Sequence, residues 1–196
     1  MSGSKGQIER FRATSGRLMG VLAVGLSVVL VGLGVAEARH GFAPWLTGVF
    51  ALGGVLAWTS MLRPALWADG DSLVMRGMVS TTAIPLAAVE SVLVRQTTSV
   101  RAGDKRYVSP VVGRSWRKLV RKPSPGERTA PGEVDYPSYV EDRISDLALA
   151  ARERAGVSLM SDEQLELARG TTTTTDLAPA FALLAACLLV VVGLFL

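Results

Sequence analysis

Three long stretches without a charged residue constrain the fold of this chain more than any other feature. They cover residues 18–36, 42–62 and 177–196 of the 196-residue sequence. The hydrocarbon core of a bilayer is about 30 Å thick, and about 20 apolar residues in an α-helix span it. Lipid offers no partners to backbone N–H and C=O groups, so each stretch is expected to be helical. We therefore predict three transmembrane helices.

The first stretch has an alternative interpretation as a secretory signal peptide. Four basic residues precede or open it within residues 1–17, and Ala36-Glu37-Ala38 resembles a small-x-small cleavage site. Its apolar run is longer than the about 7–15 residues typical of a signal peptide. A second apolar stretch also follows after only residues 37–41. Both observations favour a helical hairpin, and cleavage of the first helix stays an open alternative.

The distribution of basic residues predicts the orientation in the membrane. The N-terminal segment 1–17 is basic, the loop 37–41 carries one arginine against one glutamate, and Arg63 follows the second stretch. Basic residues are enriched on the cytoplasmic side of membrane helices. We predict a multi-pass protein of the cell (plasma) membrane, with the N-terminus and residues 63–176 in the cytoplasm and the C-terminus outside.

The first half of the middle region has the pattern of short β-strands. Residues 72–76, 80–86, 91–98 and 106–112 are rich in β-branched residues or alternate between apolar and polar positions. Gly/Asp turn signals precede the first and the last of them, as is typical of a meander or a small barrel. A proline-rich polar loop, residues 122–132, follows. The pattern predicts a small β-domain in this part of the chain.

The second half of the middle region has a helical pattern. Apolar residues recur at helical spacing over residues 138–155, and Ser138 with Glu141 has the spacing of a capping box. A shorter helix is expected over residues 162–168, capped by Ser161. The threonine run 171–175 is interpreted as an extended tether to the last membrane helix, so residues 157–176 form a short helix and a linker.

A family resemblance rests on two runs of residues. WADGDSLVMR, from Trp67 to Arg76, is followed by Ile84-Pro85-Leu86 and then by Val89 and Val92. These runs resemble the opening of bacterial pleckstrin-homology-like (PH-like) domains, especially the actinobacterial type of the low-molecular-weight protein antigen 6 family. The resemblance covers about residues 64–155. It implies a PH-like domain over residues 63–156, a β-barrel closed by a C-terminal helix, and supplies no catalytic residues.

Charge is the feature most open to a functional interpretation. Residues 95–122 contain nine basic residues against one acidic residue, Asp104. Basic residues near a cytoplasmic leaflet gain about 1 kcal/mol each from anionic lipid. The segment is either a solvated face that obeys the positive-inside rule or a site for lipid headgroups or a partner. The candidate binding residues are Arg114, Trp116, Arg117, Lys118, Arg121 and Lys122.

The reactive side chains are too few to predict an enzyme. The chain has one histidine and one cysteine, which excludes multi-histidine metal centres and cysteine zinc sites. We expect no catalytic residues, no cofactor, no metal and no nucleic-acid partner. The sequence thus predicts a membrane α+β protein that acts as a non-catalytic interaction or accessory module of a membrane assembly. The alternatives are a sensor of anionic lipid that uses residues 95–122, or an unrecognised membrane enzyme.

Overall fold

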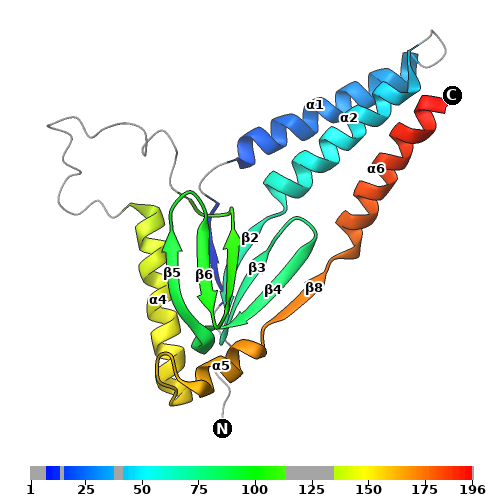
Figure 1. Ribbon diagram of the computed structural model, residues 1–196. Helices are drawn as coiled ribbons and strands as arrows, with labels where there is room; N and C mark the ends of the chain where they lie inside the picture. The colour runs from blue at the N-terminus through cyan, green and yellow to red at the C-terminus, as the bar shows by residue number, and fades with distance from the viewer. Residues whose placement is uncertain (1–7, 14–15, 38–41, 114–134, 196) are drawn as a thin grey trace, which may run out of the picture. The chain divides into compact units, whose positions relative to one another are not determined.

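The computed structural model describes residues 8–13, 16–37, 42–113 and 135–195. The chain divides into two compact units. A helical unit comprises Gly16–Pro64, Gly77–Thr81 and Thr174–Leu196, and an α/β unit comprises Met1–Ser15, Ala65–Arg76 and Thr82–Thr173. The expected mixed α+β class is confirmed, and Figure 1 labels the helices and strands of each unit.

Three helices of the helical unit are long and apolar enough to cross a membrane, as predicted. They are α1 (Arg17–Ala36), α2 (Pro44–Ala57) with its π-helical continuation η2 (Trp58–Leu62), and α6 (Leu177–Phe195). The bounds agree with the three uncharged stretches to within two residues. This agreement follows from the backbone, which must satisfy its own hydrogen bonds over the whole apolar length.

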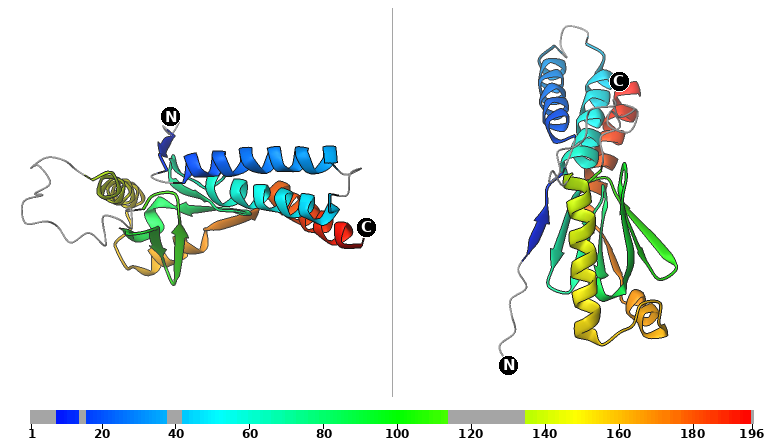
Figure 2. Two further views of the ribbon diagram at one scale, coloured as in Figure 1. Left: turned by 90° about the horizontal axis from the view of Figure 1, so that it is seen from above. Right: turned by 90° about the vertical axis from the view of Figure 1, so that its left-hand side faces the viewer.

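The three helices lie side by side (Figure 2), and glycines set their packing. A Cβ on Gly20, near the start of α1, would lie 2.8 Å from Met61 Cβ at the end of η2. At the other end of α2, a Cβ on Gly193 of α6 would lie 2.6 Å from the backbone nitrogen of Trp45. A Cβ on Gly48 would lie 2.7 Å from the backbone nitrogen of Val190. Both α1 and α6 therefore run antiparallel to α2, and α6 packs on α2 with its backbone in close contact.

A polar cluster connects the end of η2 to the start of α6. The guanidinium of Arg63, whose side chain is only 9% exposed, donates to the carbonyl oxygens of Gly77 and Met78 and pairs with Asp176. The Asp176 carboxylate also accepts from Thr81 Oγ1 at 2.8 Å. Arg63, which follows η2, and Asp176, which precedes α6, thus pair with each other and both bond residues 77–81.

The α/β unit is built on two open antiparallel sheets. A five-stranded sheet has the order β1-β2-β3-β4-β8, and a three-stranded sheet has the order β5-β6-β7. The strands are β1 (Glu9–Phe11), β2 (Ala65–Asp69), β3 (Ser72–Arg76), β4 (Ser80–Pro85), β5 (Val89–Val94), β6 (Thr98–Ala102), β7 (Lys105–Ser109) and β8 (Thr172–Thr175).

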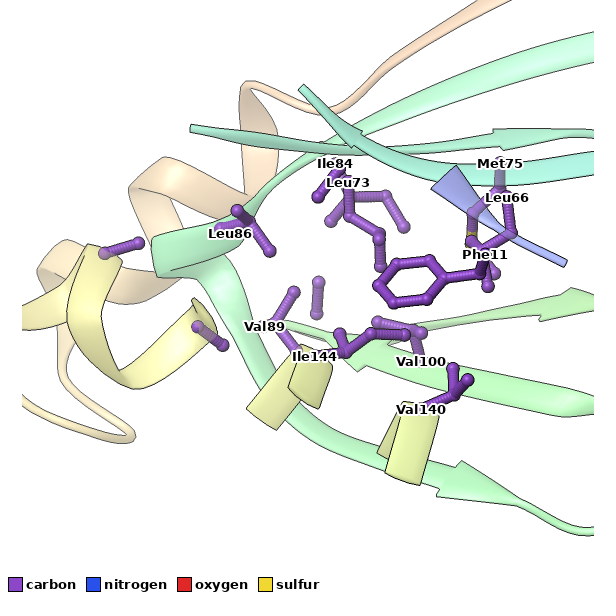
Figure 3. Packing of buried hydrophobic residues seen from close by; sticks show 14 of the residues in the cluster. Phe11, Leu66, Leu73, Met75, Ile84, Leu86, Val89, Val100, Val140 and Ile144 are labelled. Atoms are coloured by element: carbon purple, nitrogen blue, oxygen red, sulfur yellow. The ribbon is translucent and has the colours of Figure 1, made fainter. Parts of the chain in front are cut away.

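Branched apolar side chains from both sheets and from α4 (Tyr136–Ala155) form one core (Figure 3). Leu73, Ile84, Val100 and Ile144 are all completely buried. The helix lies along β5, because Arg152 donates to the carbonyl of Val89 and Glu141 accepts from the backbone N–H of Val94, 2.9 Å away. The long helix therefore runs antiparallel to β5 and closes one side of the core.

A short helix, α5 (Asp162–Arg169), follows α4 and is fixed by one buried side chain. Gln164 is 1% exposed, and its amide donates to the carbonyl of Ala87, 3.1 Å away, in the 3₁₀ turn η3 (Leu86–Ala88). Ser161 caps the helix as predicted, with its hydroxyl accepting from the backbone N–H of Gln164 at 3.2 Å. The short helix therefore has a fixed position against η3.

Four details of the fold differ from the sequence-based expectations. A closed barrel is not confirmed, because the described strands form two sheets and neither is closed. The threonine run is a strand, β8, and not only a tether. The predicted capping box is wrong, because α4 begins at Tyr136 and Ser138 lies inside it. The Glu141 carboxylate accepts instead from the backbone N–H of Val94 in β5. Strands β1, β2 and β6 were not expected.

Candidate functional site

The predicted binding residues lie outside the part of the chain that the structure describes. These are Arg114, Trp116, Arg117, Lys118, Arg121 and Lys122, together with the proline-rich loop 122–132. The N-terminal part of the same basic segment is described, and it forms strands β6 and β7 and their flanks. The basic residues of the segment that the structure describes are Arg95, Arg101, Lys105 and Arg106, and Arg101 and Arg106 share one face of the three-stranded sheet.

The three-stranded sheet has one face on the core and one face in solvent. Val92, Val100 and Tyr107 lie in register across the sheet and pack on the core. Side chains alternate between the faces of a strand, so their neighbours point the other way. We call this second side the outer face. It presents Ser91, Leu93, Arg101, Arg106 and Val108. Ser99 lies on the same side but is only 7% exposed.

Two arginines lie directly opposite each other on the outer face. Arg101 of β6 pairs in register with Arg106 of β7. Like charges opposite each other destabilise a sheet, so this pairing costs stability. Arg101 Nε lies 3.3 Å from Glu90 Oε2, and Arg106 donates to Ser99 Oγ. Arg106 is thus bonded to a buried hydroxyl, whereas the Arg101 side chain stays 63% exposed beside Glu90.

Two apolar side chains lie in the neighbouring row of the outer face. Leu93 is 40% exposed and Val108 is 57% exposed, and both lie in register with Ser99. Sequence reasoning did not single them out, because each is an ordinary residue of an alternating strand. Their signal is the register, which places them beside the arginine pair. The outer face thus combines a positive row, Arg101 and Arg106, with an apolar row, Leu93 and Val108.

Strand β7 lies at an edge of the described sheet. It pairs with β6 on one side only. Edge strands present unpaired N–H and C=O groups, and charged residues on them oppose pairing with a second copy. Lys105 and Arg106 give this edge a positive charge. The geometry therefore suits an extended segment of opposite charge.

The acidic residues do not form a metal site within the described ranges. Asp69 ends β2, and Asp71 lies in the following turn, where it pairs with Arg154. Asp104 lies in the turn between β6 and β7. Among residues 8–13, 16–37, 42–113 and 135–195, no three histidine, cysteine, aspartate or glutamate residues are placed to hold a metal ion. The turn interpretation of these aspartates agrees with their positions.

Comparison of the chain with known protein families, with curated proteins and with solved structures finds no match.

Proposed function

We propose that the protein is a non-catalytic, membrane-embedded interaction module that holds an acidic, extended segment of a partner protein. The observation that carries this proposal is the outer face, where Arg101 and Arg106 lie in register beside exposed Leu93 and Val108. An arginine fork binds a carboxylate through two parallel hydrogen bonds. An acidic segment with apolar side chains would match both rows.

A protein partner fits the outer face better than a lipid surface does. The Arg106 guanidinium is bonded to buried Ser99, which favours a ligand of defined geometry over a diffuse layer of headgroups. The edge of β7 adds main-chain donors and acceptors, which an extended peptide uses by strand addition. Binding of anionic lipid by residues 95–122 remains the alternative function.

The wider setting of this module is part of the proposal. We place the α/β unit in the cytoplasm with the N-terminus, and the C-terminus outside, because basic residues flank the first two helices on the same side. Two sheets with a long helix packed across the core are also compatible with a PH-like domain. In this arrangement the module would recruit or align a subunit of a membrane assembly.

Site-specific photo-crosslinking in native membranes tests the proposal. A photoreactive phenylalanine derivative replaces Val108 in the full chain, and the same group at Leu149 of α4, which is 50% exposed, serves as the control position. We expect a discrete protein adduct at residue 108 only. Mass spectrometry of the digested adduct should place the crosslink in an acid-rich segment of the partner.

Charge-reversal variants make the result specific. Arg101→Glu with Arg106→Glu should abolish the adduct at residue 108. Arg76→Glu with Arg154→Glu changes the charge equally, on exposed positions of β3 and α4, and should leave the adduct intact. Adducts with lipid alone would replace the proposal with the lipid-sensor alternative. An adduct that survives the first pair of substitutions would contradict the role of the arginines.

A further inference from the structure

A groove in the helical unit runs between α1 and α2, which lie side by side (Figure 2). Its volume is about 330 Å³. Valines of α1 form one wall, and small side chains of α2 together with the first residue of η2 form the other. The lining residues include Val24, Val28, Val31, Ala51, Val55 and Trp58. Because these helices are long and apolar enough to cross a membrane, we expect the groove to be filled by lipid or by another apolar segment.

The floor of the groove is closed, and its hydroxyl group is already bonded. A Cβ on Gly54 of α2 would lie 2.8 Å from Ser27 Cβ of α1, so the two helices touch there. Ser27 supplies the only hydroxyl among the described lining residues, and it donates to the carbonyl of Phe50, 2.7 Å away. Membrane helices often associate through polar side chains that bond across the interface. With its hydroxyl bonded inside the helix pair, the groove suits a hydrocarbon chain better than a polar helix face.

One end of the groove has the residues of a membrane boundary. Gly20 of α1 is level with Met61 of η2, since a Cβ on Gly20 would lie 2.8 Å from Met61 Cβ. Trp58 of η2 and Arg17, the first residue of α1, therefore lie toward the same end of the helix pair. Arg17 is exposed and precedes Val24 by about two helical turns, which places the two residues on the same face of α1. Indole rings and arginines are both typical of the boundary between lipid and water, so this end lies at the level of the headgroups.

The same end carries positive charge without a described counter-charge. The first turn of α1 has no acidic residue, and Gly16 at the N-cap supplies no side-chain cap. Arg17 makes no ion pair with the described residues. The first N–H groups of a helix lack partners within the helix and favour an anion. A phosphate bound here would meet a guanidinium and main-chain donors, whereas a cationic headgroup would find no carboxylate in this turn.

We propose that the groove holds one acyl chain of an anionic phospholipid of the phosphatidylglycerol type, whose phosphate lies at Arg17 and the start of α1. The stretch from Val24 to Val31 is about 10 Å long, so the volume corresponds to a cross-section of about 30 Å². That cross-section admits one hydrocarbon chain and is far below that of a helix about 10–12 Å in diameter. This site is separate from the outer face and does not depend on the function proposed for it.

Quenching of Trp58 fluorescence by brominated acyl chains tests the proposal, because quenching requires contact. The full chain with Trp45→Phe, Trp67→Phe and Trp116→Phe keeps Trp58 alone. It is reconstituted in phosphatidylcholine that contains a rising share of brominated phosphatidylglycerol. We expect Trp58 emission to fall as if phosphatidylglycerol were enriched about fivefold at the groove over the bilayer. A matched variant keeps only Trp45, which is 39% exposed near the start of α2, and its emission should follow the bulk composition.

Two pairs of substitutions separate the headgroup contact from the acyl-chain contact. Arg17→Gln should remove the enrichment at Trp58, and Arg10→Gln, at an exposed position of β1, should leave it unchanged. Val28→Phe places a ring in the groove and should lower the enrichment. Val29→Phe, on the same helix but outside the described lining, should not. The two valines are 66% and 58% exposed, so neither change disturbs a packed core.

Three results would overturn the proposal. The first is quenching of Trp58 that follows the bulk composition as Trp45 does. The second is an enrichment that persists in the Arg17→Gln variant. The third is Trp58 emission that brominated lipid does not quench, since a protein segment would then cover the groove. None of these results affects the crosslink expected at residue 108, so failure here is distinguishable from failure of the proposed function.

Discussion

The two units of this protein bury opposite kinds of residue. In the helical unit, the buried positions of α1 and α2 are all glycines: Gly20, Gly34, Gly48 and Gly54. Large apolar side chains of the same helices point outward, and Leu22 and Leu26 are 59% and 60% exposed. In the α/β unit the large apolar side chains are the buried ones, and they include leucine, isoleucine, valine and phenylalanine.

The difference shows which solvent each unit is built for. In water, burial of large apolar side chains drives folding, so they gather inside. In lipid the tails are as apolar as leucine, and small residues that let backbones approach supply the packing. An arrangement with large side chains outside and glycine inside would be unfavourable in water. The contrast between the units therefore supports the membrane assignment independently of helix length.

Truncation of a leucine should affect the two units very differently. Leu73→Ala removes a completely buried side chain of β3 and should cost about 4 kcal/mol, within the range for leucine truncation in a packed core. Leu188→Ala in α6, where the side chain is 58% exposed, should cost less than about 1 kcal/mol, because lipid fills the space. Equilibrium unfolding of both variants in bicelles measures this. Equal losses would show that α6 is packed in protein on that side.

The Arg63–Asp176 pair should produce the next largest effect. Asp176→Ala leaves the buried guanidinium without its counter-charge and should cost about 3 kcal/mol. The control is Asp71→Ala, which breaks the exposed pair with Arg154 and should cost less than about 0.5 kcal/mol. Unfolding in bicelles again provides the measurement. If the two variants lose the same stability, the cluster does not join α6 to the end of η2.

A single methyl group should distinguish the glycines that pack from those that do not. A Cβ at Gly48 would lie 2.7 Å from the backbone nitrogen of Val190, so Gly48→Ala should force the helices apart and cost about 2 kcal/mol. Gly53 has no heavy atom within 4 Å of a Cβ. Gly53→Ala should be neutral or stabilise by about 0.5 kcal/mol, because alanine favours the helix. Unfolding in bicelles should show a lower free energy of unfolding for Gly48→Ala and an unchanged or higher one for Gly53→Ala.

The smallest effect is expected from the ion pair between Glu9 of β1 and Arg143 of α4. The hydrogen bond and the charge of Glu9 raise the pKa of Arg143. A pKa that is higher in the folded state than in the unfolded state stabilises the fold at any pH below the unfolded-state pKa. This stabilisation is lost only as the pH rises through the folded-state pKa. The pair should therefore contribute equally between about pH 6 and pH 9.

Replacing Glu9 tests this expectation. The Arg143 and Glu9 side chains are 41% and 31% exposed, so Glu9→Gln should lower the free energy of unfolding by less than about 0.5 kcal/mol, and by less again at high salt. Unfolding curves at several pH values and salt concentrations provide the measurement. A loss that changes across this pH range would mean that another titrating group interacts with the pair.

The sequence predicted the parts of the fold that local rules determine. The three apolar helices follow from length and composition, and α5 follows from Ser161 and the turn before it. Strand β3 has the predicted bounds, Ser72–Arg76, because a glycine turn precedes an apolar run. In each case the residues that decide the structure lie within a few positions of one another.

The remaining parts depend on partners far away in sequence. Glu9–Phe11 forms a strand because β2 pairs with it, and Thr172–Thr175 forms a strand because β4 lies beside it. Glu141 fits the local capping pattern, but it bonds the N–H of Val94, 47 positions away, instead. The candidate surface was missed for the same reason, since only the register reveals that Arg101 faces Arg106.

The position of β1 has a consequence for how the protein is made. This strand precedes α1, and its partner β2 follows η2, so 53 residues separate Phe11 from Ala65. At a synthesis rate of about 5–20 residues per second, β1 waits about 3–10 seconds for its partner. Both edge strands of the sheet adjoin membrane helices, β1 before α1 and β8 before α6. Translation therefore couples assembly of the sheet to insertion of the spans, and a delay in insertion would leave its edges open to aggregation.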